Sequence, residues 1–380
     1  MATRIEPNVQ FIREMQAAGG ESLKKCYQCA TCSVICPLSP EDAPFPRKEM
    51  IWAQWGLKDK LVNDIDIWLC HNCGECSDNC PRGAKPADLL AALRNMAYKS
   101  LAKPAILGKW MSSPKYLPQL IAIPAVLFLI VWAISTGLRI PEGEIIFAKV
   151  FPTLAAIDPI FILVTLFVVF TFISSIGSMF SSFKASGLTP KEDAPGIFRS
   201  LIMVVKDEII DHRKFKECES NQDRYPGHLL IFYGFIALAI VTGTIALFYW
   251  TDKLFGFGMT TPLALWNPVK ILANVGGIAL IIGLIYMTRS RLNADTRNAI
   301  NSYYDWYILG VIWVVAVTGF LAQIFRLADT ATLAYWVYYV HLVSVFMLFA
   351  YLPWSKLAHL VYRTAALAYA RQIDRRGFDE

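Results

Sequence analysis

Charged residues are scarce in this sequence. Of its 380 residues, 17% are charged and 55% are hydrophobic, a balance that is unusual for a soluble enzyme. Residues 1–25 also lack the charged start and apolar core of a signal peptide, because they form a polar segment that ends at Gly19 and Gly20. A Gly-x-Gly-x-x-Gly segment after a strand is absent, so we expect any nucleotide or flavin chemistry to come from a partner. The scarcity of charged residues predicts a membrane protein, and the missing signal-peptide pattern predicts that its N-terminal part stays in the cytoplasm.

Long apolar stretches occur only after residue 116. A bilayer crossing takes roughly 20 apolar residues, and six stretches approach that length. The predicted spans are residues 117–137, 159–180, 227–250, 268–287, 304–325 and 333–354. Their interiors hold almost no ionisable side chain, with Lys270 and Asp305 close to span ends. The chain is therefore predicted to cross the membrane six times.

The basic residues between the spans indicate the orientation. Lys and Arg are retained on the cytoplasmic side of a membrane, and the connections 181–226 and 288–303, with the tail after residue 354, contain most of them. They include Lys184, Arg213, Lys214, Arg224, Arg289, Arg291 and Arg363. The opposite connections contain Arg139, Lys149, Lys253 and Arg326. Both termini are thus predicted to be cytoplasmic.

The net charge of +6 is explained mostly by these basic residues on the cytoplasmic side of the membrane. The head has no clustered basic face, so we exclude nucleic-acid binding.

Eight of the nine cysteines form two copies of one pattern, Cys-x2-Cys-x2-Cys-x3-Cys-Pro, offset by 44 residues. In two-cluster bacterial ferredoxins this spacing places three thiolates on one 4Fe-4S cluster and the fourth on the other cluster. We therefore assign the ligands crosswise. The first predicted cluster takes Cys26, Cys29, Cys32 and Cys80, and the second takes Cys70, Cys73, Cys76 and Cys36.

Zinc and disulfides are the alternatives for these cysteines. Zinc ribbons use two Cys-x2-Cys hooks for one metal, whereas each run here has four thiols. Disulfides are rare in the cytoplasm. The ninth cysteine, Cys218, stands alone and is interpreted as a packed residue. His71, inside the second run, is interpreted as a bystander that tunes the potential, since four thiolates already suffice.

The sequence divides into five parts: a dicluster head at 1–110, two spans within 117–180, a cytoplasmic connection at 181–226, a four-helix haem b domain at 227–365 and a tail at 366–380. We call residues 1–110 the head. Within it, short helices are predicted at 6–18, 47–57 and 87–98, the last preceded by Pro86 at a helix start. The predicted fold is mainly α-helical, a ferredoxin-like head followed by a six-helix cytochrome b-type bundle.

Four histidines lie in or beside the predicted membrane part: His212, His228, His341 and His359. A histidine in an apolar helix is rare unless it has a function, and His pairs across facing helices commonly hold b-type haem. His341 and His359 are 18 residues apart, which is five helical turns, so we expect them to share one helix face and to lie roughly 27 Å apart. Because His228 and His359 have matching depths at the cytoplasmic side, we pair them around an inner haem.

The partner of His341 stays open. His212 lies in an amphipathic stretch at 198–215 on the cytoplasmic side, whereas His341 lies well inside the membrane. Either His212 folds back on a re-entrant segment, or the outer haem is absent, or another ligand completes it. His212 could equally be a solvated interfacial residue.

Two sets of segments resemble known families. KCYQCATCSVICP and LCHNCGECSDNCP resemble the small, C-type iron–sulfur subunit of heterodisulfide reductases. RYPGHLLIFYGF and YYVHLVSVFMLFAYLPWSKLAHLVYR are similar to the ligand helices of the membrane cytochrome b (gamma) subunit of respiratory nitrate reductase. This second resemblance carries His228, His341 and His359 onto haem-ligand positions. It departs at Leu238, which stands where the nitrate reductase protein has a further histidine.

The combination resembles the membrane subunits of quinone-interacting membrane-bound oxidoreductase (Qmo) complexes of sulfate-reducing bacteria. That resemblance implies a bacterial inner-membrane protein with two 4Fe-4S clusters and one or two haems b. It also implies electron exchange between menaquinone and cytoplasmic flavin and iron–sulfur partners, QmoA- and QmoB-like, which connect to adenylylsulfate reductase. A quinone pocket is expected within spans three to six, with the clusters and haem passing electrons singly.

Three other functions compete with this one. A thiol–disulfide enzyme would need the Cys-Cys-Gly segments of the heterodisulfide reductase component that reduces the substrate, and these are missing. A passive membrane anchor would hold its clusters and haem for structure alone. The cytochrome component of a methanophenazine-linked or sulfite-linked complex would differ in partner and not in mechanism.

Overall fold

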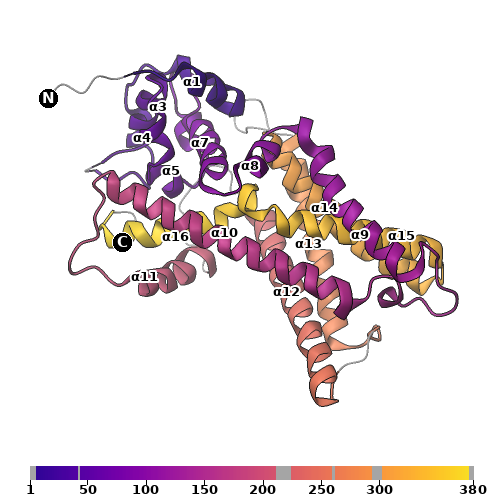
Figure 1. Cartoon of the computed structure of the whole chain (residues 1–380). Coiled ribbons are helices and arrows are strands. Elements are labelled where there is room, and N and C mark those ends of the chain that lie inside the picture. The colour runs from indigo at the N-terminus through magenta and orange to yellow at the C-terminus, as the bar shows by residue number, and fades with distance from the viewer. Residues whose placement is uncertain (1–5, 42, 211–223, 259–261, 293–301, 376–380) are drawn as a thin grey trace.

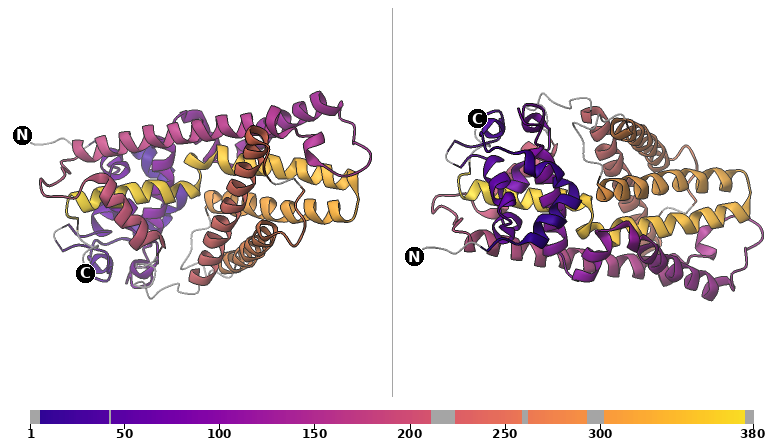
Figure 2. Two further views of the ribbon diagram at one scale, coloured as in Figure 1. Left: turned by 90° about the horizontal axis from the view of Figure 1, so that it is seen from below. Right: turned by 90° about the horizontal axis from the view of Figure 1, so that it is seen from above.

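The computed structural model describes residues 6–41, 43–210, 224–258, 262–292 and 302–375 (Figure 1). Every regular element in these ranges is a helix, which confirms the predicted mainly helical class. The N-terminal helices gather at one end, and long apolar helices extend away from them (Figures 1 and 2). Four residues singled out in the sequence lie outside the described residues: His212, Arg213, Lys214 and Cys218.

The head contains a series of mostly short helices. They are α1 (Val9–Met15), α2 (Thr31–Val34), α3 (Arg47–Gln54), α4 (Lys58–Val62), α5 (Asp66–Leu69), α6 (Glu75–Asp78), α7 (Pro86–Leu101) and α8 (Ala105–Met111). The three predicted head helices correspond to α1, α3 and α7. The Asn8 side chain accepts from the Phe11 N–H at 2.9 Å and begins α1. Pro86 occupies the first turn of α7, where a missing N–H costs nothing.

A serine of each cysteine run also caps the start of a helix that comes later in the chain. The Ser33 hydroxyl accepts from the Arg47 N–H at 3.1 Å, at the start of α3. At the equivalent position of the second run, the Ser77 hydroxyl accepts from the Ala87 N–H at 3.2 Å, in the first turn of α7. The first N–H groups of a helix have no partner inside it, so each hydroxyl satisfies one of them. The duplication in sequence is therefore a duplication in structure.

Among the described residues, six helices are long and apolar enough to cross a membrane, as predicted. They are α9 (Leu117–Thr136), α10 (Asp158–Ala185), α12 (Arg224–Phe255), α13 (Pro268–Leu292), α14 (Tyr303–Leu327) and α15 (Ala331–Ala350). Large apolar side chains point outward from α9 and α10, with Ile134, Leu163 and Phe170 exposed by 81%, 67% and 72%. Such faces suit lipid tails, since helices with satisfied backbones can expose apolar side chains there.

The spans pack in two groups. The first group is a layer of α9, α10, α14 and α15, tied by tyrosines of the last span: the Tyr339 hydroxyl donates to the Ala125 carbonyl at 2.8 Å. The second group is the pair α12 and α13, which crosses that layer at a steep angle (Figure 2). The α12 and α13 backbones approach closely because glycines face each other, and a Cβ added to Gly234 would lie 3.0 Å from the Gly276 carbonyl oxygen.

The sixth predicted span is not one continuous helix. Helix α15 ends at Ala350, two 3-10 turns follow at Leu352–Trp354 and Lys356–Ala358, and α16 (His359–Gln372) begins a new helix. Pro353 lies in the first turn, where it lacks the N–H that would continue the ladder. The prediction that His341 and His359 share one face of a straight helix, roughly 27 Å apart, is therefore wrong.

Helix α16 packs on the head and is not a free tail. One hydrophobic core contains Trp68 and Leu90 of the head, Phe183 of α10, and Tyr362 and Ala366 of α16. Helix α11 (Ile197–Val204) lies alongside α16, and Arg371 donates to the Asp207 carboxylate at 2.8 Å. The C-terminal helix thus joins the head to the membrane part (Figure 1).

Candidate electron-transfer centres

The thiols proposed for the first cluster lie close together although Cys80 comes from the second run. Burial raises the pKa of the Cys32 thiol to about 11, and the neighbouring Cys26, Cys80 and Cys29 add to that rise. Burial also raises the pKa of Cys26, and Cys80 is its largest cysteine contribution. The exposed Cys29 differs, because a hydrogen bond with the Thr31 hydroxyl at 3.3 Å lowers its pKa. The fold therefore brings Cys26, Cys29, Cys32 and Cys80 together.

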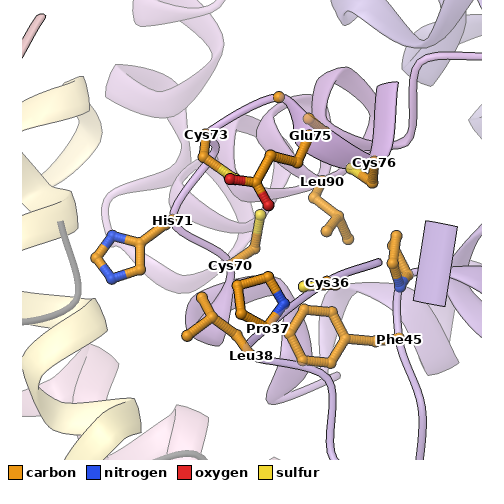
Figure 3. A pocket seen from close by; sticks show the side chains of 13 residues that line it. Cys36, Pro37, Leu38, Phe45, Cys70, His71, Cys73, Glu75, Cys76 and Leu90 are labelled. Atoms are coloured by element: carbon orange, nitrogen blue, oxygen red, sulfur yellow. The ribbon is translucent and has the colours of Figure 1, made fainter. Parts of the chain in front are cut away.

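The thiols proposed for the second cluster line one pocket (Figure 3). These residues are Cys36, Cys70, Cys73 and Cys76. Burial raises the pKa of Cys36 to about 12, followed among cysteines by Cys70 and Cys73, which belong to the other run. Burial raises the pKa of Cys76 further, and Cys32 of the first set is among its neighbours. The two sets are thus adjacent, each completed by one cysteine of the opposite run.

The donor set fits iron–sulfur clusters. A buried thiolate is costly on its own, and several together repel one another. Bound metal reverses this situation, because a coordinating thiol is deprotonated and its charge is shared with the metal. The surroundings supply N–H donors as well: the Gln28 N–H points at Cys26 Sγ at 3.4 Å, and the Asn72 N–H at Cys70 Sγ at 3.2 Å. Such N–H···S bonds adjust a cluster's reduction potential.

The backbone of both runs is shaped for these contacts. Gln28 and Asn72 have φ of 61° and 60°, and Ala30 and Gly74, two residues further on, have φ of 71° and 101°. These left-handed positions are uncommon outside glycine. Here they let the chain turn around a common centre. The sequence spacing predicted a wrapped centre, but no residue-type signal marked the left-handed positions at Gln28 and Ala30.

His71 belongs to the same pocket, but its ring points away from the sulfurs. Figure 3 shows the imidazole directed outward from the Cys70 loop, while the thiols of Cys36 and Cys70 point inward. This orientation leaves the centre of the pocket to the four cysteines. The predicted role of His71 in tuning the potential stays a prediction.

A buried group of charges beside α5 was not predicted from the sequence. The carboxylates of Glu49, Asp64 and Asp66 lie within 4.8 Å of one another and are buried. Lys48 donates to Asp64 at 3.4 Å and also to Asp66. Arg375 binds Asp66 through two hydrogen bonds, of 3.0 and 2.5 Å. Two cations therefore already compensate this acidic group, and we do not assign it a metal.

His228 and His359 are brought near each other, as the pairing requires. Burial lowers the pKa of His359 to about 3, and the charges of His228 and Lys356 also oppose its protonation. The His359 Nδ1 lies 2.6 Å from the Lys356 carbonyl oxygen, so the neutral ring donates through Nδ1. That tautomer leaves the Nε2 lone pair for a metal, the usual arrangement of a ligating histidine. These two neighbouring histidines are the described residues that could hold a haem.

The position of His359 is fixed by an ion-pair network around Asp305. Arg291 donates to Asp305 at 2.9 Å, the Ser302 hydroxyl donates at 2.6 Å, and Lys356 donates as well. The same Lys356 holds His359 through its backbone carbonyl. Asp305 stood out in the sequence only as an ionisable residue at a span end, so its link to His359 could not be predicted.

His341 has a different environment. Its Nδ1 lies 3.0 Å from the Thr318 hydroxyl of α14, and a Cβ added to Gly319 would lie 3.2 Å from its Cε1. The second histidine considered for an outer haem, His212, lies outside the described residues. Leu238, at the departure from the nitrate reductase pattern, packs with the apolar core between the spans. A second haem site is therefore not assembled by the described histidines.

Together, fold and sulfur sites define a multi-pass membrane protein with an N-terminal dicluster domain. A family model described as "4Fe-4S dicluster domain" matches residues 22–84, in agreement with the sulfur sites. A second model, described as "Citrate utilization protein B", matches residues 209–378. The second match covers the part that holds His228, His341 and His359. No solved structure matches the chain.

Characterised relatives match the N-terminal part. The C-type component of the H(2):CoB-CoM heterodisulfide,ferredoxin reductase of Methanothermobacter marburgensis is 39% identical over 92 residues, which are 24% of this chain and 49% of that protein. A C-type iron–sulfur component of the CoB–CoM heterodisulfide reductase of Methanocaldococcus jannaschii is 40% identical over 100 residues, 24% of this chain and 53% of that protein.

A further relative matches a longer part of this chain. The E-type component of the dihydromethanophenazine:CoB–CoM heterodisulfide reductase of Methanosarcina acetivorans is 29% identical over 149 residues, 37% of this chain and 56% of that protein. The chain spans about half the length of the relatives it matches. Its N-terminal quarter is thus an iron–sulfur domain like that of the C-type heterodisulfide reductase components, and the chain is a membrane-associated electron-transfer protein.

Proposed function

We propose that this chain is the membrane subunit of a respiratory oxidoreductase complex, of the QmoC type, that relays electrons between menaquinone and cytoplasmic partners. In this proposal the head and both termini face the cytoplasm of a bacterial cell, and the partners are QmoA- and QmoB-like flavin and iron–sulfur subunits. Adenylylsulfate reductase is the indirect partner. The five-part division of the sequence is kept, except that residues 366–375 belong with the head through α16.

One observation carries the proposal: α16 connects the two kinds of site. Its first residue is His359, and one turn later the Arg363 guanidinium donates to the Trp68 carbonyl at 3.0 Å. Trp68 lies two residues before Cys70, and its ring contacts the Tyr362 ring at 5.7 Å between centroids. The first turn of α16 therefore contains the candidate haem ligand His359 and is hydrogen-bonded to the segment that carries the candidate cluster ligand Cys70.

The chain's own residues have separate tasks in this function. Cys26, Cys29, Cys32 and Cys80 would hold one 4Fe-4S cluster, and Cys70, Cys73, Cys76 and Cys36 the other. His228 and His359 would hold haem b, with Nδ1 of His359 kept protonated by the Lys356 carbonyl. When bound, these groups supply one-electron redox chemistry that separates the two electrons of a quinol. The haem ligand role of His341, and that of His212 at low priority, depend on whether a second haem binds.

The test is to add a menaquinol analogue to the anaerobic, detergent-purified holoprotein. We expect b-type haem bands to reduce in the optical spectrum, together with cluster signals in the electron paramagnetic resonance (EPR) spectrum. His359→Ala should abolish the haem bands that belong to the His228 site. His71→Asn is the matched control, because its ring points away from the sulfurs, and it should retain them. Clusters without any quinol-reducible haem would favour the passive anchor.

A second candidate is the cytochrome component of a heterodisulfide reductase-like or sulfite-linked complex. The match to a dihydromethanophenazine-linked protein favours it, because that match reaches 37% of the chain. The two candidates differ in the membrane carrier. A reduced phenazine analogue that reduces the haem at least tenfold faster than the menaquinol analogue would favour the second candidate over the first.

A further inference from the structure

A glutamine of α3 binds the backbone at the start of the first cysteine run. The Gln54 side-chain amide donates to the carbonyls of Leu23 and Cys26, at 3.1 and 3.0 Å. The Gln54 side-chain oxygen accepts from the Gln28 side chain at 2.8 Å, which keeps the amide N–H groups directed at the two carbonyls. A neutral group thus holds the backbone of the first ligand of this run.

An arginine of α7 makes the same pair of contacts in the second run. The Arg94 guanidinium donates to the carbonyls of Ile67 and Cys70, at 3.1 and 2.7 Å. Ile67 and Cys70 each come 44 residues after a carbonyl that Gln54 binds, and 44 residues is also the offset between the cysteine runs. The two pairs of carbonyls are therefore equivalent in the repeat, but the second pair is held by a cation.

Gln54 and Arg94 also occupy equivalent places on their helices. Arg47 and Ala87 mark the helix starts, because the N–H of each donates to the serine hydroxyl of a cysteine run. Gln54 comes seven residues after Arg47, and Arg94 comes seven residues after Ala87, which is about two helical turns in both cases. Both side chains are partly buried. The two copies share this position and its hydrogen bonds, and they differ in its charge.

The charge of Arg94 matters because reduction changes the charge of a cluster. One-electron reduction adds a negative charge to the cluster and its four thiolates, and nearby charge is one of the factors that set the reduction potential. At an effective dielectric constant of about 20, two unit charges roughly 10 Å apart change an equilibrium by about tenfold or more. The guanidinium stays protonated at all relevant pH values. Among the described residues Arg94 has no carboxylate partner that would neutralise it.

We propose that Arg94 is a positioning residue that raises the reduction potential of the cluster ligated by Cys70, an increase that the neutral Gln54 does not give the cluster ligated by Cys26. The inference rests on the proposed function for the two clusters and their ligands, but it does not depend on the quinone or the haem. The Cys70 loop is the one joined to α16, through the Trp68 carbonyl. Arg94 therefore favours an electron on the cluster beside the membrane part.

Other charges near the ligands are of two kinds. Those beside the first run are exposed cations, which water and salt screen: Lys24, Lys25, Arg47 and Arg82. Beside the second run, Figure 3 shows the Glu75 carboxylate among the cysteines of the pocket, where it opposes reduction. Changing residue 94 alone leaves all of these charges in place. A shift in potential in such a variant then belongs to Arg94.

A redox titration of the anaerobic holoprotein, followed by EPR, tests the proposal. Dithionite and mediators supply the electrons, so the result does not depend on quinol. The Cys36→Ser and Cys80→Ser variants identify which signal belongs to which cluster. In Arg94→Gln we expect the equilibrium for reduction of the Cys70 cluster to fall about tenfold, which lowers a one-electron potential by about 59 mV. The potential of the Cys26 cluster should stay unchanged.

Two further variants separate charge from hydrogen bonding. Glutamine already donates to both carbonyls in the first run, so Arg94→Gln should keep its iron. Arg94→Lys keeps the charge without the planar fork, and we expect its reduction equilibrium to stay within about threefold of the original. Lys99→Gln removes a cation from an exposed position of the same helix and should change neither cluster by more than about twofold. If Arg94 only held the backbone, Arg94→Gln would leave the potential unchanged, and that result would overturn the proposal.

The reciprocal change tests the same reasoning on the other run. Gln54→Arg places a cation beside the Cys26 carbonyl and should raise the reduction equilibrium of that cluster about tenfold. This variant decides the matter if Arg94→Gln loses iron. Unchanged potentials in both would refute the role of residue 94 while leaving quinol reduction of haem intact. Loss of quinol reduction in the unmodified protein would refute the quinone relay while leaving the shifts in the titration.

Discussion

Replacing Arg375 with Gln should loosen the attachment of α16 to the second cysteine run. Arg375 donates to both oxygens of Asp66, at 3.0 and 2.5 Å, and to the Ala43 carbonyl at 2.7 Å. Asp66 is fully buried and Arg375 is 8% exposed. Because Asp66 begins α5 and α5 leads directly into Cys70, this ion pair fixes the run against the C-terminal helix.

The magnitude follows from what remains after the change. Removing one partner of a buried ion pair typically costs about 3–5 kcal/mol, since a buried charge loses its compensation. Lys48 still donates to Asp66, so we expect the lower end, about 3 kcal/mol. At about 1.4 kcal/mol per factor of ten, local opening of α5 becomes roughly 100-fold more frequent.

Hydrogen–deuterium exchange of the holoprotein measures that opening. Amides of α5, including the Cys70 N–H that donates to the Asp66 carbonyl at 3.4 Å, should exchange about 100-fold faster in Arg375→Gln. Asp374→Asn is the matched control, because its ion pair with Lys191 at 2.5 Å is 53% exposed on both sides. Exposed pairs contribute about 0.2–1 kcal/mol, so exchange should rise less than about fivefold. Equal exchange in the two variants would refute the structural role of Arg375.

Three further predictions concern the head and the haem ligand. Cys36→Ser should damage the EPR signal of the Cys70–Cys73–Cys76 cluster and spare the other, whereas Cys80→Ser should do the reverse; damage to the cluster of the same run would contradict the crossed ligands. Glu49→Gln should be at least as stable as the original protein at pH 8 in thermal unfolding, because burial, Asp64 and Asp66 raise the pKa of Glu49. The contribution of the Glu49 proton to stability is fully present below the pKa that Glu49 has in the unfolded chain, and it is lost as pH rises through the raised pKa of the folded protein. Gln cannot lose a proton, so the unfolding temperature of the Glu49→Gln variant should decline less between pH 5 and 8 than that of the original protein. A steeper decline in the variant would contradict this reasoning. Asp305→Asn weakens the hold on Lys356 and so on His359, and we expect the haem b content per chain to fall by at least half without loss of iron; full haem content would show that the network does not position His359.

Much of the fold could be predicted because its signals are local. The six spans are recognised by their length and apolarity. The helix predicted at 87–98, which corresponds to α7, is recognised by Pro86 at its start and by its apolar pattern. The Cys-Pro runs predicted the dicluster head because their spacing repeats. These features depend on residues close together in sequence.

The features that could not be predicted depend on residues far apart. The Arg375–Asp66 pair joins positions 309 apart in sequence, and Lys356 reaches Asp305 across the break before α16. That break was missed because residues 333–354 are apolar throughout, and apolarity does not distinguish a straight helix from one interrupted at Pro353. For that reason the prediction that His341 and His359 lie on one face of a single helix was wrong. The pairing of His228 with His359 was based on their similar depth at the cytoplasmic side of the membrane, so it did not need a straight helix.

The most direct test of the central claim is the content of iron, acid-labile sulfide and haem per chain in the purified protein. The account predicts about eight non-haem irons, a similar amount of sulfide, and one or two haems b. One haem would assign the site to His228 and His359, and two would require a partner for His341. Zinc in place of iron, or the absence of haem, would contradict the account.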